Sequence, residues 1–173
     1  MTIQILKTPD NLLRQRSEEV ISFDKSLTQT VADLIDTLES QTDPVGLGLS
    51  AIQIGVLKRV FVARVKNRIK HFVNPKIIKF SKKEVTFLEG CFSVPEFYGH
   101  VARPAELDLE AQDKLGKKTQ GHYRGLPARI IQHEIDHLDG VLFTDHVHAQ
   151  NGKIFKIEKD KKGKEQLVEI TFA

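Results

Sequence analysis

The residues best suited to chemistry are the two histidines and the glutamate in Gln132-His133-Glu134-Ile135-Asp136-His137. Residues four apart share one face of an α-helix, so both imidazoles would point at one spot if this segment is helical. This is the H-E-x-x-H pattern of zinc-type hydrolases, in which the paired His bind a metal and the Glu acts as general base. The alternative is a polar stripe on an amphipathic helix.

The flanking sequence predicts a helix over Ala128 to Leu138. Pro127 suits a first helical turn, where a missing N–H costs nothing. No helix breaker follows until Gly140, which is placed to end the helix in a left-handed conformation. Both histidines therefore fall on a regular helix.

A metal held by two imidazoles needs a third protein ligand to make a zinc-type catalytic site. The protease pattern with a third His downstream is not met, because Phe143 stands at that position. Two candidates remain: Glu158, in a segment that reads as strand, and Cys91, the only cysteine of the chain. A lone cysteine is equally typical of a small buried apolar residue, so both ligand sets stay open at this point.

The sequence around Cys91 resembles the peptide deformylases, which remove the formyl group from the amino end of newly made bacterial proteins. The similarity runs from about Leu6 to Phe143. One departure is Ile52, where the family usually has Pro, so the shape of that loop is expected to differ. Three motifs carry the resemblance, in the family's order and spacing: Gly46-Leu47-Gly48-Leu49-Ser50-Ala51-Ile52-Gln53, Glu89-Gly90-Cys91-Phe92-Ser93 and Gln132-His133-Glu134-Ile135-Asp136-His137.

The resemblance implies a metal site and a proton carrier. One divalent ion would be held by Cys91, His133 and His137. The family commonly uses Fe(II), and the same ligand set also accepts Zn, Ni or Co. Glu134 would take a proton from the attacking water, while the side-chain amide of Gln53 and the backbone N–H of Phe92 would stabilise the oxyanion.

The resemblance also implies how a substrate is held. Leu47, Gly48 and Gly90 would bond the extended peptide backbone as an added strand, and Leu126 and Ile130 would line an apolar pocket for Met. Three further residues are expected beside the metal site and the pocket. Glu89 and Arg103 would brace the loop that carries the thiolate, the alternative being an ordinary surface ion pair, and Arg129 is expected at the pocket rim.

The elements that must position these residues predict an α+β fold, with antiparallel β-sheets wrapped around a central helix that carries both His. Apolar residues at helical spacing predict a further helix from Leu27 to Leu38, capped by Asp24 or Ser26. Alternating patterns predict strands over Ile3–Leu6, Val60–Val65, Ile69–Val73, Ile77–Phe80, Val85–Leu88, Leu107–Ala111, Lys117–Tyr123, Ile154–Glu158 and Gln166–Phe172.

The composition sets outer bounds on these expectations. With 173 residues, 40% of them hydrophobic, we expect residues 1–173 to form one catalytic domain with a sizeable core. The 26 basic residues exceed the 23 acidic ones too slightly to indicate nucleic-acid binding. The basic runs Lys76–Lys83 and Lys153–Lys164 predict solvated edges, with a contact to ribosomal phosphates as the alternative.

The same sequence predicts a cytoplasmic protein of bacterial type, or its organelle counterpart. The amino end has no signal-peptide pattern, no stretch is apolar enough to cross a bilayer, and a single Cys cannot form an internal disulfide. The expected partners are N-formyl-Met nascent peptides, without a membrane or a specific nucleic-acid sequence, and the ribosome is a partner only on the alternative interpretation of the basic runs.

Two other classes of function remain open from the sequence. The first is a metalloprotease that uses His133, His137 and Glu158. The second is a non-catalytic metal-binding protein that docks on the ribosome, an alternative that the unusual Ile52 keeps in view.

Overall fold

The computed structural model describes residues 1–170 as an α+β fold of two antiparallel sheets, three α-helices and two 3₁₀ turns. The helices and turns are η1 (Asn11–Arg14), α1 (Lys25–Ser40), η2 (Ala51–Ile54), α2 (Leu126–Leu138) and α3 (Phe143–Ala149). The strands are β1 (Gly48–Ser50), β2 (Val60–Val65), β3 (Arg68–Phe80), β4 (Glu84–Cys91), β5 (Val94–Pro104), β6 (Glu106–Gln112), β7 (Lys118–Arg124), β8 (Ile154–Lys159) and β9 (Glu165–Ile170).

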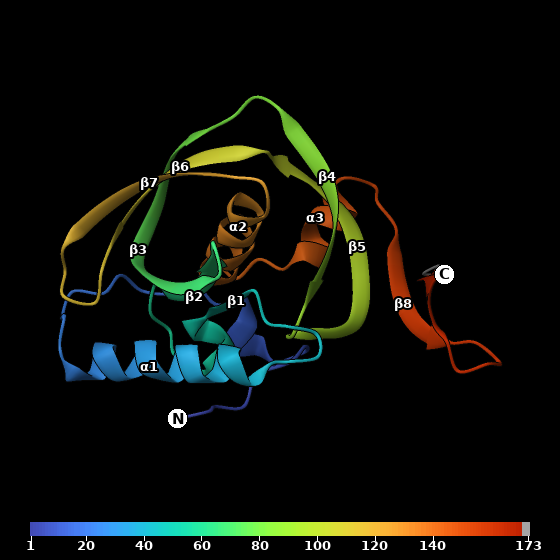
Figure 1. Cartoon of the computed structure of the whole chain (residues 1–173), viewed down its shortest axis with the longest axis horizontal. Coiled ribbons are helices and arrows are strands. Elements are labelled where there is room, and N and C mark those ends of the chain that lie inside the picture. Colours follow the sequence, from blue (N-terminus) through green and yellow to red (C-terminus); the bar gives the residue numbers. More distant parts are fainter. Residues whose placement is uncertain (171–173) are drawn as a thin grey trace.

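The two sheets lie on either side of α2. One sheet has the order β1-β2-β3-β6-β7 and the other β4-β5-β8-β9, and every neighbouring pair is antiparallel. Figure 1 shows α2 near the middle of the molecule, with the first sheet curving around it and β4 and β5 passing on its other side. The central position of α2 brings its residues against both sheets.

Strand β2 is apolar at nearly every position because both of its faces are covered. Val60 and Val62 pack with α1, which lies outside the first sheet, whereas Phe61 and Ala63 pack with α2 inside it. Alternate side chains of a strand point to opposite faces, so this one strand joins two cores. The amphipathic α1 begins at the cap Asp24, whose Oδ1 accepts from the N–H of Leu27 at 3.1 Å, as the sequence predicted.

A third hydrophobic core lies between the second sheet and α3. It includes residues of β5 and α3, two elements that the sequence pattern did not predict. Gly99 of β5 has no Cβ, and a Cβ there would come within 2.5 Å of Val147 on α3. Strand β5 was missed because Pro95, Gly99 and Pro104 interrupt its pattern. The short helix α3 was missed because it follows the end of α2 so closely.

Most predicted strands are confirmed, with changed boundaries. Ile69–Val73 and Ile77–Phe80 form one bent strand, β3, whose ladder with β6 carries two register shifts. The strand predicted over Ile3–Leu6 is wrong: the segment has no strand conformation and is held by single contacts such as Leu6 N–H to Gln53 O at 2.8 Å. The final hairpin is confirmed to Ile170, and its predicted end at Phe172 lies outside the described residues.

Within residues 1–170, none of the helices combines the length and apolar character that crossing a membrane would need.

Candidate active site

Helix α2 places His133 in the wall of an open cavity and His137 one turn further along, behind that wall. The helix has Pro127 in its first turn and ends at Leu138, followed by the cap residue Asp139 and by Gly140 with φ +73°. A side chain at Gly140 would collide with the backbone of Arg14, so the left-handed residue also allows η1 to pack closely. Ile131 and Leu138 anchor the opposite face of the helix in the core. His133 and His137 are thereby fixed one turn apart.

Three side chains converge at this point. Cys91, at the end of β4, has its Sγ 3.2 Å from His137 Nε2, which lies 3.2 Å from His133 Nε2. Ligand bonds of roughly 2.0–2.3 Å in a tetrahedral site require donor atoms at about this spacing. One thiolate and two imidazoles are also the type of donor set that binds Zn²⁺ or Fe(II). Within the described residues, Cys91, His133 and His137 are the group whose donor atoms lie close enough to hold an ion.

The thiol of this cluster is held in its charged form. Burial raises the pKa of the Cys91 thiol, but His137 and His133 outweigh burial and hold that pKa well below its ordinary value. The thiolate is the form that binds a metal. The N–H at the other ring nitrogen of His133, Nδ1, donates to Glu89 Oε2 at 3.0 Å, so Nε2 is the ring nitrogen that faces the cluster.

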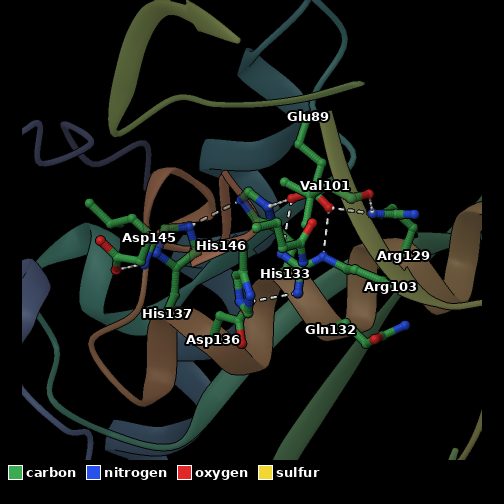
Figure 2. Close-up of polar contacts among 12 residues, drawn as sticks. Glu89, Val101, Arg103, Arg129, Gln132, His133, Asp136, His137, Asp145 and His146 are labelled. Carbon is green, nitrogen blue, oxygen red and sulfur yellow. Dashed lines mark hydrogen bonds and ion pairs between the residues drawn. The ribbon is translucent and has the colours of Figure 1, made fainter. Parts of the chain in front are cut away.

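Glu89 lies at the centre of a buried polar network behind the cluster. Its carboxylate accepts from Arg103 Nε at 2.6 Å and Nη2 at 3.0 Å, and from Arg129 Nη1 at 2.8 Å. Figure 2 shows Arg103, Arg129 and His133 directed at Glu89 from β5 and α2. The side chains of Glu89 and Arg103 are 4% and 5% exposed, so the interpretation as an ordinary surface ion pair is wrong.

The network continues to α3. Arg103 Nη1 donates to Asp136 Oδ2 at 2.7 Å, and the same oxygen lies 2.8 Å from His146 Nε2. Burial raises the pKa of Asp136, but His146 and Arg103 outweigh it and lower that pKa. No sequence pattern indicated this extension, because His146 lies outside all three motifs and α3 was not predicted.

Glu134 and Gln53 flank the cluster. Glu134 is 3% exposed, and burial raises the pKa of its carboxyl against the opposing effect of His133 and His137. Gln53, in η2, has its Nε2 3.6 Å from Cys91 Sγ and donates to Ser93 Oγ at 3.0 Å. Ile52 replaces the usual Pro, yet η2 forms as a regular 3₁₀ turn and keeps the Gln53 amide beside the thiolate.

The cluster opens into a cavity of about 710 Å³. Arg129, expected at the pocket rim, lies in the cavity wall, and its guanidinium bonds inward to Glu89 and to the carbonyl groups of Val85 and Val101. His137 and Arg103 lie behind the wall. The lining includes the other residues singled out from the sequence: Leu47, Gly48, Gln53, Glu89, Gly90, Cys91, Phe92, Leu126, Ile130, His133 and Glu134.

Glu158 lies apart from this constellation. It is an exposed residue of β8, on the strand that extends the second sheet away from α2. It does not line the cavity and is not in the group with ligand atoms close enough to hold an ion.

All the comparisons with known proteins point to one family. A family model described as polypeptide deformylase matches residues 2–153. A peptide deformylase of Rhizobium meliloti (strain 1021) is 40% identical over 153 residues, covering 85% of this chain and 86% of that protein. A solved peptide deformylase structure from Legionella pneumophila superimposes with a TM-score of 0.79 at 39% identity, covering 84% of this chain and 86% of that one. A Plasmodium falciparum peptide deformylase in complex with an inhibitor gives 0.75 at 41% identity, with 82% and 87% covered.

Proposed function

Because the chain belongs to the polypeptide deformylase family, we propose that Cys91, His133 and His137 hold the ion with which it removes N-terminal formyl groups from new polypeptides. The protein is a hydrolase of this family, and formyl-group removal is the family's reaction. The observation that carries the residue assignment is the convergence of one sulfur and two imidazole nitrogens at the end of the cavity.

The ion, when bound, supplies Lewis acidity, which polarises the formyl group and makes water nucleophilic near neutral pH. Fe(II) is our choice of ion, with Zn, Ni or Co as ions that the same donors accept. His133 Nδ1 bonds to Glu89, and this contact fixes the orientation of the imidazole ring. Arg103 and Arg129 hold Glu89 in turn.

Glu134 is the group that moves the proton. Its carboxylate lies in the cavity wall one residue after His133, and the raised pKa of a buried carboxyl makes it a better proton acceptor than an exposed one. It takes a proton from the attacking water and delivers it to the nitrogen of the leaving amine. The products are formate and a free amino terminus.

Gln53 and Phe92 are placed to stabilise the charge that develops on the formyl oxygen. The Gln53 Nε2 group lies beside the thiolate, and Phe92 directly follows Cys91 in the β4–β5 turn. Donors that are already oriented cost no reorganisation when the oxyanion forms. Both residues line the cavity.

The substrate enters as an extended peptide along the edges of β1 and β4. Each is an edge strand of its sheet, so each has backbone groups available for an added strand. Leu47, Gly48 and Gly90 contribute these backbone groups. Leu126 and Ile130, on the first turns of α2, form the apolar wall that receives the Met side chain.

We place this chemistry in one catalytic domain, residues 1–173, which acts on nascent peptides in the cytoplasm or an equivalent organelle compartment. The support for the location is the substrate, because formyl groups are carried by chains just made. The basic runs Lys76–Lys83 and Lys153–Lys164 are the surfaces that would meet the ribosome, and the second of them includes the exposed turn of the β8–β9 hairpin.

The experiment that tests this function compares two substrates with anaerobically purified, metal-loaded protein. We expect formate release from a formyl-Met peptide and no cleavage of an internal peptide with blocked ends. Cleavage of the blocked peptide without formate release would favour the metalloprotease alternative. Metal binding without either reaction would favour a non-catalytic protein.

A further inference from the structure

Ser50 lies between the two groups that we assign to proton transfer and to oxyanion stabilisation. It is the last residue of β1 and is fully buried. Its Oγ lies 2.7 Å from Glu134 Oε2 and 2.9 Å from the backbone oxygen of Glu134. Its backbone N–H donates to Gln53 Oε1 at 2.9 Å. One residue therefore contacts both groups.

The contact with Ser50 makes the two oxygens of Glu134 unequal. Oε2 is bonded to the hydroxyl, whereas Oε1 faces Gly48, where a Cβ would come within 2.5 Å of it. Gly48 and Glu134 both line the cavity. The absence of a side chain at Gly48 thus leaves room in front of Oε1 in the cavity wall.

The Ser50 hydroxyl has two acceptors within bonding distance, Oε2 and the backbone oxygen of Glu134. A hydroxyl carries one hydrogen, so it donates to one of them at a time. The contact with Oε2 is the shorter of the two, at 2.7 Å, and it ties the carboxylate to β1.

Gln53 is held by a different part of the same residue. The backbone N–H of Ser50 fixes Gln53 Oε1, which turns Nε2 toward Cys91 and Ser93. Any amino acid other than proline supplies that N–H. Replacing the Ser50 side chain therefore removes the contact with Glu134 and leaves the contact with Gln53 in place.

We propose that Ser50 is a positioning residue for the reaction: its hydroxyl holds Glu134 Oε2, so that Oε1 alone takes the proton from water and returns it to the amine nitrogen. The proposal rests on the deformylase function proposed for this site. The proton that Oε1 accepts when the water O–H breaks is the one it delivers when the formyl C–N bond breaks, so Ser50 gains and loses none.

The test is a comparison of Ser50→Ala, Ser50→Thr and Ser17→Ala with the metal-loaded wild type. We expect Ser50→Ala to lower kcat roughly 10-fold, the effect of losing one hydrogen bond to a charged group, with KM for a formyl-Met peptide and metal content unchanged. Ser50→Thr keeps the hydroxyl and should restore most of kcat. Ser17 is also buried, and its Oγ has no partner within the described residues, so Ser17→Ala should leave kcat unchanged.

An unchanged kcat in Ser50→Ala would overturn the proposal. So would a joint loss of kcat, substrate affinity and metal that Ser50→Thr fails to restore, because that pattern indicates a structural role alone. The wild type in the same assay reports separately on the function, since failure of the wild type to release formate would overturn the deformylase assignment and this proposal with it.

Discussion

His133 Nδ1 lies 3.0 Å from Oε2 of Glu89, so a proposed metal ligand is held by a buried carboxylate that also pairs with two arginines. The pairing fixes which ring nitrogen of His133 faces the cluster. It also means that changes at Glu89 act on metal binding and on folding together. Two of the following predictions separate these effects.

Glu89→Gln should weaken metal binding without abolishing it. The amide can still contact His133 but no longer carries the charge that raises the basicity of the ring, and losses of roughly 10- to 100-fold in metal affinity are typical of such changes. Competition with a chelator measures the affinity. Unchanged retention of the ion would show that Glu89 does not support His133.

In metal-free protein, the buried Glu89 carboxylate should also make the stability of the fold depend on pH. Burial raises the pKa of Glu89, but His133 and Arg103 outweigh it and hold the pKa well below the ordinary 4.5. A carboxyl with a lowered folded pKa stabilises the fold above its unfolded pKa, and this contribution is lost as the pH falls through the folded value. The contribution of the Glu89 charge to the stability gap between wild type and Glu89→Gln should therefore shrink as the pH falls below 4.5.

Denaturant unfolding of the two metal-free proteins between about pH 5 and pH 3 measures that gap. A gap that grows as the pH falls would contradict a lowered pKa for Glu89 in the folded protein.

Gln53→Ala should lower kcat by roughly 10²- to 10³-fold, as removal of one oriented oxyanion donor typically does. Metal content should stay the same, because Gln53 contacts Cys91 only through a long 3.6 Å interaction. Steady-state kinetics with metal analysis checks both points. A normal kcat would remove Gln53 from the mechanism.

Gly48→Ala tests the space in front of Glu134. The added Cβ would lie 2.5 Å from Glu134 Oε1 and 2.8 Å from Ile130 Cγ2, so the carboxylate must move. A displacement of about 1 Å at a reacting group can cost roughly 10²-fold in rate, and we expect kcat to fall accordingly. Gly121→Ala, whose Cβ would approach only Tyr123 at 2.8 Å, is a control for crowding outside the cavity. Equal effects of the two variants on kcat would contradict the account.

The identity of the ion can be tested by exposure to air. If Fe(II) is the working ion, air should inactivate the enzyme by oxidising the iron or the Cys91 thiolate, whereas protein loaded with Ni or Co should keep its activity. Formate release before and after aeration measures the loss. Full activity in air with only zinc bound would contradict the choice of iron.

The sequence predicted helix α2 well because its signals are local: Pro127 at its start, unbroken spacing and Gly140 at its end. It also predicted the α+β fold, since alternation marks the strands and the motifs mark the family. The strand prediction over Ile3–Leu6 was wrong because a short apolar run does not indicate whether a neighbouring strand pairs with it. Strand β5 was not predicted because prolines and a glycine are unfavourable in strands. It forms because it pairs with both β4 and β8.

Two features of the site could not be read from the sequence for the same physical reason. The sequence suggested only that Arg129 lies at the pocket rim, and it did not show that Glu89 and Val85 of β4 and Val101 of β5 accept hydrogen bonds from its guanidinium. Ser50 belongs to a motif, yet only the approach of α2 to β1 brings its hydroxyl to Glu134. Both depend on contacts between residues far apart in the chain.

The central claim is that Cys91 completes the metal site and that Glu134 moves protons without binding the ion. Metal stoichiometry and formate release should therefore be measured together in Cys91→Ala, Glu134→Ala and Glu158→Ala, all purified without oxygen. We expect Cys91→Ala to lose both metal and activity, because two imidazoles alone form a much weaker site. Glu134→Ala should keep the metal and lose turnover, and Glu158→Ala should keep both. One metal per chain in Cys91→Ala, together with loss of metal in Glu158→Ala, would contradict the account.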